Sequence, residues 1–344
     1  MRNSMLAQTF DIDLQVGDSV ESFVNWLTST FGWFFGGVRS AVGAVVDLTE
    51  WALTGPSPLI MTLVFTLIAF VATRSWGLPL FTAVAFLLID GMGRYPEAMQ
   101  TLALVLVATV LAVLIGIPLG IVAARSGKFS MAIKPVLDFM QTMPSFVYLL
   151  LAVVFFRIGR VPGVMSALIF AMPPAVRLTE LGIRQVDKEV VEAAEAFGAR
   201  PREVLTGVQL PLARASIMAG VNQVIMLSLS MVVIAGLGGA PGLGRTVVRA
   251  VTSMNLGMGI EGGLGIVILA IFLDRVTAAF GREGRGRSGA SAGTDEASLS
   301  DQDDPDSSGG EGDVHAPDAD ADSDPATGPT DSTMTTTDHP SPPR

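Results

Sequence analysis

Cysteine is absent from the 344 residues of the chain, and histidine occurs only at His315 and His339. A disulfide scaffold, a thiolate metal site and a cysteine nucleophile are therefore excluded. Residues before 288 hold no imidazole, so this part of the chain lacks the commonest metal ligand and proton relay. Charged residues are also scarce, at 16%, whereas 50% of residues are hydrophobic and the mean hydropathy is +0.53. This balance excludes a soluble enzyme and predicts an all-α polytopic membrane protein.

The charge is unevenly distributed along the chain. Residues 288–344 contain fourteen acidic residues against one basic residue, Arg344, among many Ser, Gly, Pro and Thr. Such a composition buries too little apolar surface to offset the entropy lost on ordering. We therefore predict three parts: an extracytoplasmic N-terminal segment at 1–53, a transmembrane domain at 54–282 and a disordered acidic cytoplasmic tail at 283–344.

Uncharged runs locate the candidate membrane spans, because a helix needs about 20 mostly apolar residues to cross the hydrocarbon. Seven such runs are present, the last interrupted only by Glu261: 51–73, 75–89, 98–124, 139–156, 161–176, 215–244 and 250–273. Two pairs of glycines are spaced four residues apart in or beside these runs, Gly116 with Gly120 and Gly159 with Gly163. These pairs indicate either close helix packing or chance in a glycine-rich chain.

Lysine and arginine set the expected orientation. With the N-terminus outside, the cytoplasmic segments hold fourteen Lys and Arg and the outer segments hold seven. We therefore expect a multi-pass protein of the cytoplasmic membrane with its C-terminal tail inside.

Apolar residues recur at helical spacing between Val20 and Val46, with polar residues between them. This pattern predicts an amphipathic helix with a candidate break at Gly36–Gly37. With three tryptophans nearby, we expect it to lie at the outer membrane interface. The alternative is an eighth span at 31–46.

The most informative segment is the loop at 179–212. Residues 188–197 are good helix formers, and Gly198 is suited to a left-handed C-terminal cap. Pro201 is suited to the first turn of a second helix, and Pro211 marks the start of the next span. Two short helices at a glycine corner indicate a docking site for a cytoplasmic partner, the alternative being a plain connector.

Five polar residues within the spans or at the start of one are candidates for a translocation pathway: Asp138, Gln141, Tyr148, Asn222 and Gln223. For Asp138 and Gln141 we favour pairing with Arg or backbone over contact with a solute. Asn222 and Gln223 are either functional or engaged in hydrogen bonds between helices.

Three features lie toward the ends of the later spans. The glycine-rich segment 236–244 indicates either a flexible turn or an outer gate. Glu261 and Asp274 lie near opposite ends of the last span, and we expect both side chains to reach the interfaces.

The loop resembles the signature of ABC-importer permease subunits. Its residues are Glu192, Ala193, Ala194, Gly198, Val208 and Pro211, with Val208 where the family usually has Ile. Further stretches, 138–149, 160–163, 170–179, 182–186 and 218–223, resemble the glycine betaine/proline-betaine (osmoprotectant) uptake permeases. The resemblance covers roughly residues 20–280.

The resemblance implies the transmembrane domain of a binding-protein-dependent type I importer. Two permease copies would form the pore, and two ATPase subunits would each receive the coupling helix at Glu192–Gly198. The ATPase subunits would use ATP and Mg, and this chain would bind no cofactor and no metal. An extracytoplasmic binding protein would deliver the solute, membrane lipid would surround the spans, and no nucleic-acid partner is expected.

The sequence itself agrees with a pore-forming subunit that is not an enzyme, because it has no Gly-x4-Gly-Lys-Ser/Thr phosphate loop. Its two Tyr, and its four Trp at or before residue 76, form no obvious aromatic cage for a quaternary amine. The alternatives are an ABC permease for another small substrate, such as a methionine-type amino acid, and an ion-coupled secondary transporter. The latter needs a charged midplane residue or repeated halves, and neither is evident.

Overall fold

The computed structural model describes residues 16–282, and in this part of the chain all regular secondary structure is helical. The elements, in chain order, are α1 (Val16–Thr30), α2 (Gly32–Thr54), α3 (Pro58–Thr73), α4 (Gly77–Gly91), α5 (Tyr95–Arg125), α6 (Gly127–Thr142), α7 (Ser145–Phe156), α8 (Arg160–Arg184), α9 (Lys188–Ala196), α10 (Pro201–Val204), the π-helical turn η1 (Leu205–Gln209), α11 (Leu210–Ala235), the 3-10 turn η2 (Gly236–Gly238), α12 (Leu243–Thr252) and α13 (Leu256–Arg282). The acidic tail predicted at 283–344 lies outside the described residues.

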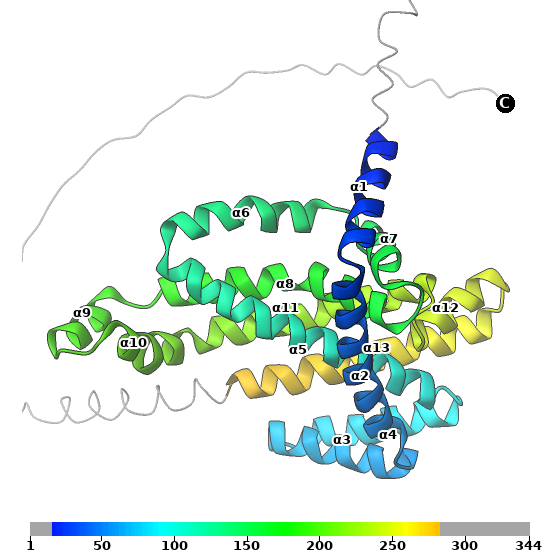
Figure 1. Cartoon of the computed structure of the whole chain (residues 1–344). Helices are drawn as coiled ribbons and strands as arrows, with labels where there is room; N and C mark the ends of the chain where they lie inside the picture. Colours follow the sequence, from blue (N-terminus) through cyan, green and yellow to red (C-terminus); the bar gives the residue numbers. More distant parts are fainter. Residues whose placement is uncertain (1–15, 283–344) are drawn as a thin grey trace, which may run out of the picture. The chain divides into compact units, whose positions relative to one another are not determined.

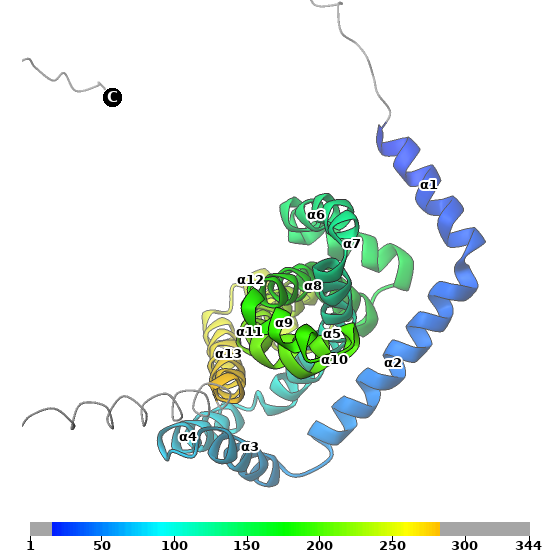
Figure 2. The same cartoon turned by 90° about the vertical axis from the view of Figure 1, so that its left-hand side faces the viewer.

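Helices α5, α8 and α11 form the centre of the bundle (Figures 1 and 2). The close approach of α5 to α8 depends on two glycines. A Cβ atom on Gly116 would lie 2.6 Å from the Cβ of Ala175, and one on Gly120 would lie 2.6 Å from the carbonyl oxygen of Val176. The predicted packing role is therefore confirmed for this pair.

The second glycine pair is only half engaged in packing. A Cβ atom on Gly163 would lie 3.1 Å from the Cβ atoms of both Ala235 and Ala240, whereas one on Gly159 would have nothing within 4 Å. Gly159 instead has φ +143°, a conformation that favours glycine and shapes the corner before α8.

Four helical segments of the described chain are long and apolar enough to span a membrane: Tyr95–Arg125, Arg160–Arg184, Pro201–Gly238 and Leu256–Ala279. Two bent pairs raise the number to six if each pair counts as one span, and α4 is a shorter apolar helix. The sequence predicts about seven spanning helices, and the described residues hold four to six by length and composition, with α4 in addition as the shorter helix.

The two bends fall inside predicted spans. The candidate span 139–156 is divided between α6 and α7, which meet at 98°, and 51–73 is divided between α2 and α3, which meet at 100°. In the first case the bend lies at Met143–Pro144, where Met143 is extended. A residue before proline disfavours the helical conformation, so the helix ends there.

The predicted N-terminal amphipathic helix is present as two helices. Its break lies at Phe31 rather than at Gly36–Gly37, through which α2 continues. The side chains of Trp33 and Trp51 are 79% and 71% exposed. Alone, α2 is not among the helices that meet the criteria for a span, and its interfacial position remains a prediction.

Candidate coupling site and outer clasp

A short polar helix follows directly from the end of α8. Asp187 begins it, because its side chain accepts a hydrogen bond from the backbone N–H of Glu189 at 3.0 Å. The helix ends at Ala196 and is followed by Gly198, which has φ +84° and donates its N–H to the carbonyl of Glu195 at 2.9 Å. Ala199 then donates to the carbonyl of Ala194 at 3.1 Å. The predicted left-handed cap at Gly198 is therefore confirmed.

The second short helix begins at Pro201, in the first-turn position that its sequence predicts. The Arg200 N–H donates to the Glu203 carboxylate at 2.8 Å, which satisfies one free donor of this helix start. The chain then continues through η1 into α11, whose first turn contains Pro211. Residues 187–211 therefore form a helical hairpin at one end of α8 and α11, which we call the coupling hairpin (Figure 1).

The coupling hairpin has an exposed surface that is suited to contact with a partner protein. Helix α9 buries none of its residues, Glu192 and Ala193 are exposed, and Ala194 is half-buried. Phe197 at its tip is 93% exposed. Sequence reasoning did not select this aromatic, although a phenylalanine directly before a cap glycine on a polar helix was a usable signal.

Three of the five pathway candidates have polar partners among the described residues, and no two of them share one. Arg177 on α8 pairs with Asp138, and the Tyr148 hydroxyl donates to the carbonyl of Met140 at 2.6 Å. These contacts match the expected structural pairing of Asp138. Gln141 and Gln223 are exposed.

Asn222 on α11 donates from its Nδ2 to the Oδ1 of Asp274 on α13 at 2.9 Å. This is the helix–helix hydrogen bond that the sequence left open as one alternative. Asp274 therefore pairs with Asn222 and Glu261 pairs with Arg94, and the expectation that both side chains reach the interfaces stays a prediction. Their partners lie 52 and 167 residues away in the sequence, so no local pattern indicates them.

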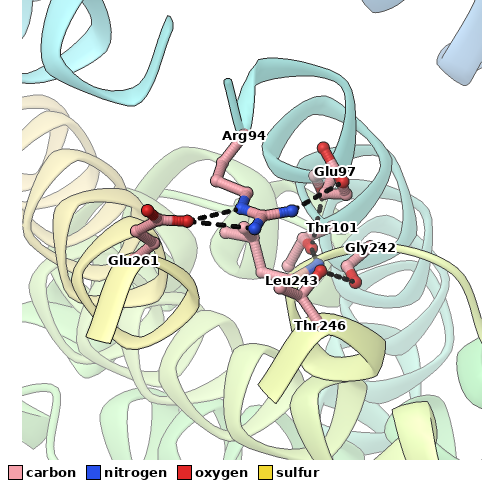
Figure 3. A network of polar contacts seen from close by, with 7 residues as sticks. All are labelled: Arg94, Glu97, Thr101, Gly242, Leu243, Thr246 and Glu261. Atoms are coloured by element: carbon pink, nitrogen blue, oxygen red, sulfur yellow. Dashed lines mark hydrogen bonds and ion pairs between the residues drawn. The ribbon is translucent and has the colours of Figure 1, made fainter. Parts of the chain in front are cut away.

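A second polar cluster lies at the opposite end of α5 from the coupling hairpin. Arg94, just before α5, contacts the Oε2 of Glu261 on α13 through Nε and Nη2, each at 3.0 Å, and Glu97 at 3.5 Å (Figure 3). Thr101 accepts the backbone N–H of Leu243, the first residue of α12, at 2.8 Å. These contacts, which we call the outer clasp, hold α12 and α13 against α5.

Gly242 shapes the turn before α12. Its φ is +108°, and a Cβ atom there would lie 2.4 Å from the Oγ1 of Thr101. We expect Gly242→Ala to destabilise the chain by about 1–3 kcal/mol through backbone strain, with a further loss from the displaced Thr101 contact. The thermal unfolding midpoint of the purified chain measures this change. Gly257→Ala is the control, because its Cβ would meet only Asn255 Oδ1 at 3.6 Å. Equal midpoints for the two variants would contradict the clasp.

Within residues 16–282, which contain no histidine or cysteine, the acidic side chains form no group of three that could hold a metal ion.

Membrane-length helices around α5, α8 and α11, with a polar hairpin at one end, define the transmembrane domain of a type I ABC importer. A solved structure of the MetNI methionine ABC transporter in an inward-facing conformation has this fold, with a TM-score of 0.51 at 19% sequence identity. The match covers 55% of this chain and 94% of that chain.

Comparison with known proteins assigns the family. Residues 116–283 match the family described as binding-protein-dependent transport system inner membrane component. The chain is 48% identical over 265 residues to the glycine betaine transport system permease protein OpuAB of Bacillus subtilis, covering 77% of this chain and 93% of the relative. It is 47% identical to the glycine betaine/carnitine transport permease protein GbuB of Listeria monocytogenes, covering 77% of this chain and 95% of the relative. It is also 47% identical to the glycine betaine/proline betaine permease ProW of Escherichia coli, covering 77% and 74%. The chain belongs to this family of inner-membrane ABC-importer permeases.

Proposed function

We propose that this chain is the pore-forming subunit of an ATP-driven importer for glycine betaine and similar compact zwitterions. The observation that carries the substrate class is the identity of 47–48% to three permeases whose names share glycine betaine. The pathway candidates agree with a solute of no net charge, because the charges of Asp138 and Arg177 neutralise each other.

The coupling hairpin is the proposed contact with the ATPase subunit. Glu192, Ala193 and Ala194 form its exposed or half-buried surface, and Gly198 permits its corner. Pro211 begins the helix that returns to the bundle. ATP and Mg are used by the partner subunit, and two copies of it serve two copies of this chain.

This assignment fixes the proposed orientation. The coupling hairpin lies on the cytoplasmic side, so the outer clasp, at the other end of α5, lies on the side where a binding protein delivers solute. Asp138, Gln141, Tyr148, Asn222 and Gln223 remain candidates for the pathway. A second copy of the chain is a suitable neighbour for α6, which exposes Met131 and Phe139 to 69% and 62%.

Uptake by the complete complex tests the substrate. Vesicles containing this chain with its ATPase subunit and binding protein are expected to accumulate labelled glycine betaine when ATP is supplied. Unlabelled proline betaine, carnitine, choline, trimethylamine N-oxide and methionine are then added as competitors. Competition by betaines, with no competition by methionine, is the expected result. Background uptake of glycine betaine together with transport of methionine would contradict the assignment.

A further inference from the structure

A buried acidic side chain lies near the end of α8, just before the coupling hairpin. Glu180 is 6% exposed, and its Oε1 accepts a hydrogen bond from the Oγ of Ser130 on α6 at 2.6 Å. The Nε of Arg184 lies 3.0 Å from the same oxygen. Burying a carboxylate is costly unless its oxygens are bonded, so these two contacts hold Glu180 in one position.

The contacts of Arg184 extend this cluster to a third helix. Its Nη2 donates to the carbonyl of Ala123, in the last turn of α5, at 2.9 Å. Ala123, Ser130, Glu180 and Arg184 therefore join α5, α6 and α8 at one point, which we call the Glu180 cluster. Only three residues separate Arg184 from Lys188, the first residue of α9.

The second short helix of the coupling hairpin is bonded to the same end of α5. Arg125, the last residue of α5, donates from Nη2 to the carbonyl of Pro201 at 3.0 Å. A cavity of about 300 Å³ between α9 and the bundle is lined by residues that include Arg184, Glu192 and Glu195. The hairpin is therefore bonded directly to one of the helix ends that the Glu180 cluster joins.

Helix α6 is held to the bundle at two polar points. It packs on α5 and α8 far less extensively than these two helices pack on each other. Its contact between Asp138 and Arg177 is largely exposed, with side chains 63% and 39% accessible, and exposed ion pairs contribute little. The other attachment of α6 is the hydrogen bond from Ser130 to Glu180. This attachment is buried, because Ser130 is only 2% exposed.

We propose that Glu180 is a positioning residue that transmits movement of the coupling hairpin to α6 through Ser130 and to α5 through Arg184. The proposal rests on the function proposed above, in which the hairpin receives the ATPase subunit. When the hairpin moves, Arg184 and Glu180 move with the end of α8. Because Glu180 is bonded to Ser130, α6 follows, and α6 carries the pathway candidates Asp138 and Gln141.

Ser130→Ala tests the proposal, because it removes the bond to Glu180 and leaves only a hydroxyl-sized gap. Hydrolysis of ATP and uptake of glycine betaine are measured in the same vesicles of the complete complex. We expect the ATPase subunit to remain bound and hydrolysis to stay near the wild-type rate. Uptake per ATP hydrolysed is expected to fall about tenfold, the loss associated with a hydrogen bond to a charged group.

Two further variants separate positioning from folding. Glu180→Gln keeps an acceptor for Ser130 but removes the charge facing Arg184, so its loss should combine non-additively with that of Ser130→Ala. Thr142→Ala is the control, because its exposed hydroxyl on α6 bonds to the carbonyl of Phe139 in the same helix at 3.1 Å. It should keep the wild-type ratio of uptake to hydrolysis.

A wild-type ratio of uptake to hydrolysis in Ser130→Ala would overturn the proposal, whether both rates are unchanged or both fall by the same factor. A failure of the proposed function has a different signature, since the wild-type complex itself would then show no ATP-dependent uptake.

Discussion

Phe197→Ala is expected to weaken binding of the ATPase subunit about 30-fold or more, without loss of the chain from the membrane. The side chain is 93% exposed at the tip of α9, where it contributes little to the fold. A large aromatic at the centre of a docked surface typically accounts for a major share of the binding energy. Titration of the purified ATPase subunit onto the detergent-solubilised chain measures the change.

Phe23→Ala provides the matched control. Phe23 lies on α1, far from the coupling hairpin in sequence, and is 59% exposed. The Phe23→Ala substitution removes the same type of side chain from another surface, so binding of the ATPase subunit should not change. If Phe197→Ala binds as tightly as Phe23→Ala, the tip of α9 is not part of the contact.

Gly120→Ala is expected to produce the largest loss of stability. The added Cβ would lie 2.6 Å from the Cβ of Thr179 and 2.6 Å from the carbonyl oxygen of Val176. One of these atoms is a Cβ and the other is a backbone oxygen, so neither can move without its helix. Helices α5 and α8 must therefore separate to admit the added methyl group. We expect about 3 kcal/mol of destabilisation, at the upper end of the usual cost of overpacking. The thermal unfolding midpoint and the yield of monodisperse chain report this loss.

Gly37→Ala controls for the effect of helix propensity. Gly37 lies inside α2 and has nothing within 4 Å of a built Cβ, so alanine there should be neutral or slightly stabilising. A Gly120→Ala chain as stable as Gly37→Ala would show that α5 and α8 do not pack as closely as described.

Local chemistry explains why the coupling hairpin could be predicted from sequence. The cap at Gly198 and the helix start at Pro201 depend on residues within a few positions of one another. The ends of the hairpin were likewise marked by proline and by good helix formers. The long span α5 was equally accessible, because its uncharged apolar run at 98–124 exceeds the length needed to cross a membrane.

Features that depend on three-dimensional arrangement were not predicted in the same way. The bend at Met143–Pro144 lies inside an uncharged run, so a search for apolar length passed over the signal that Pro144 supplied. The partners of Glu261 and Asp274 lie on other helices, and an intramembrane carboxylate alone does not indicate which helix satisfies it. The Glu180 cluster similarly appears only when α5, α6 and α8 are brought together.

Site-specific crosslinking tests the central claim most directly, because the chain has no cysteine and any introduced thiol is unique in it. Ala193→Cys places a thiol on the exposed face of α9, and Met254→Cys places one at the turn after α12, where Met254 is 94% exposed. In the assembled complex, a short thiol-to-amine crosslinker is expected to join the Ala193→Cys chain to the ATPase subunit and the Met254→Cys chain to no ATPase subunit. Crosslinking of the ATPase subunit at position 254, with none at position 193, would contradict the coupling assignment and the proposed orientation together.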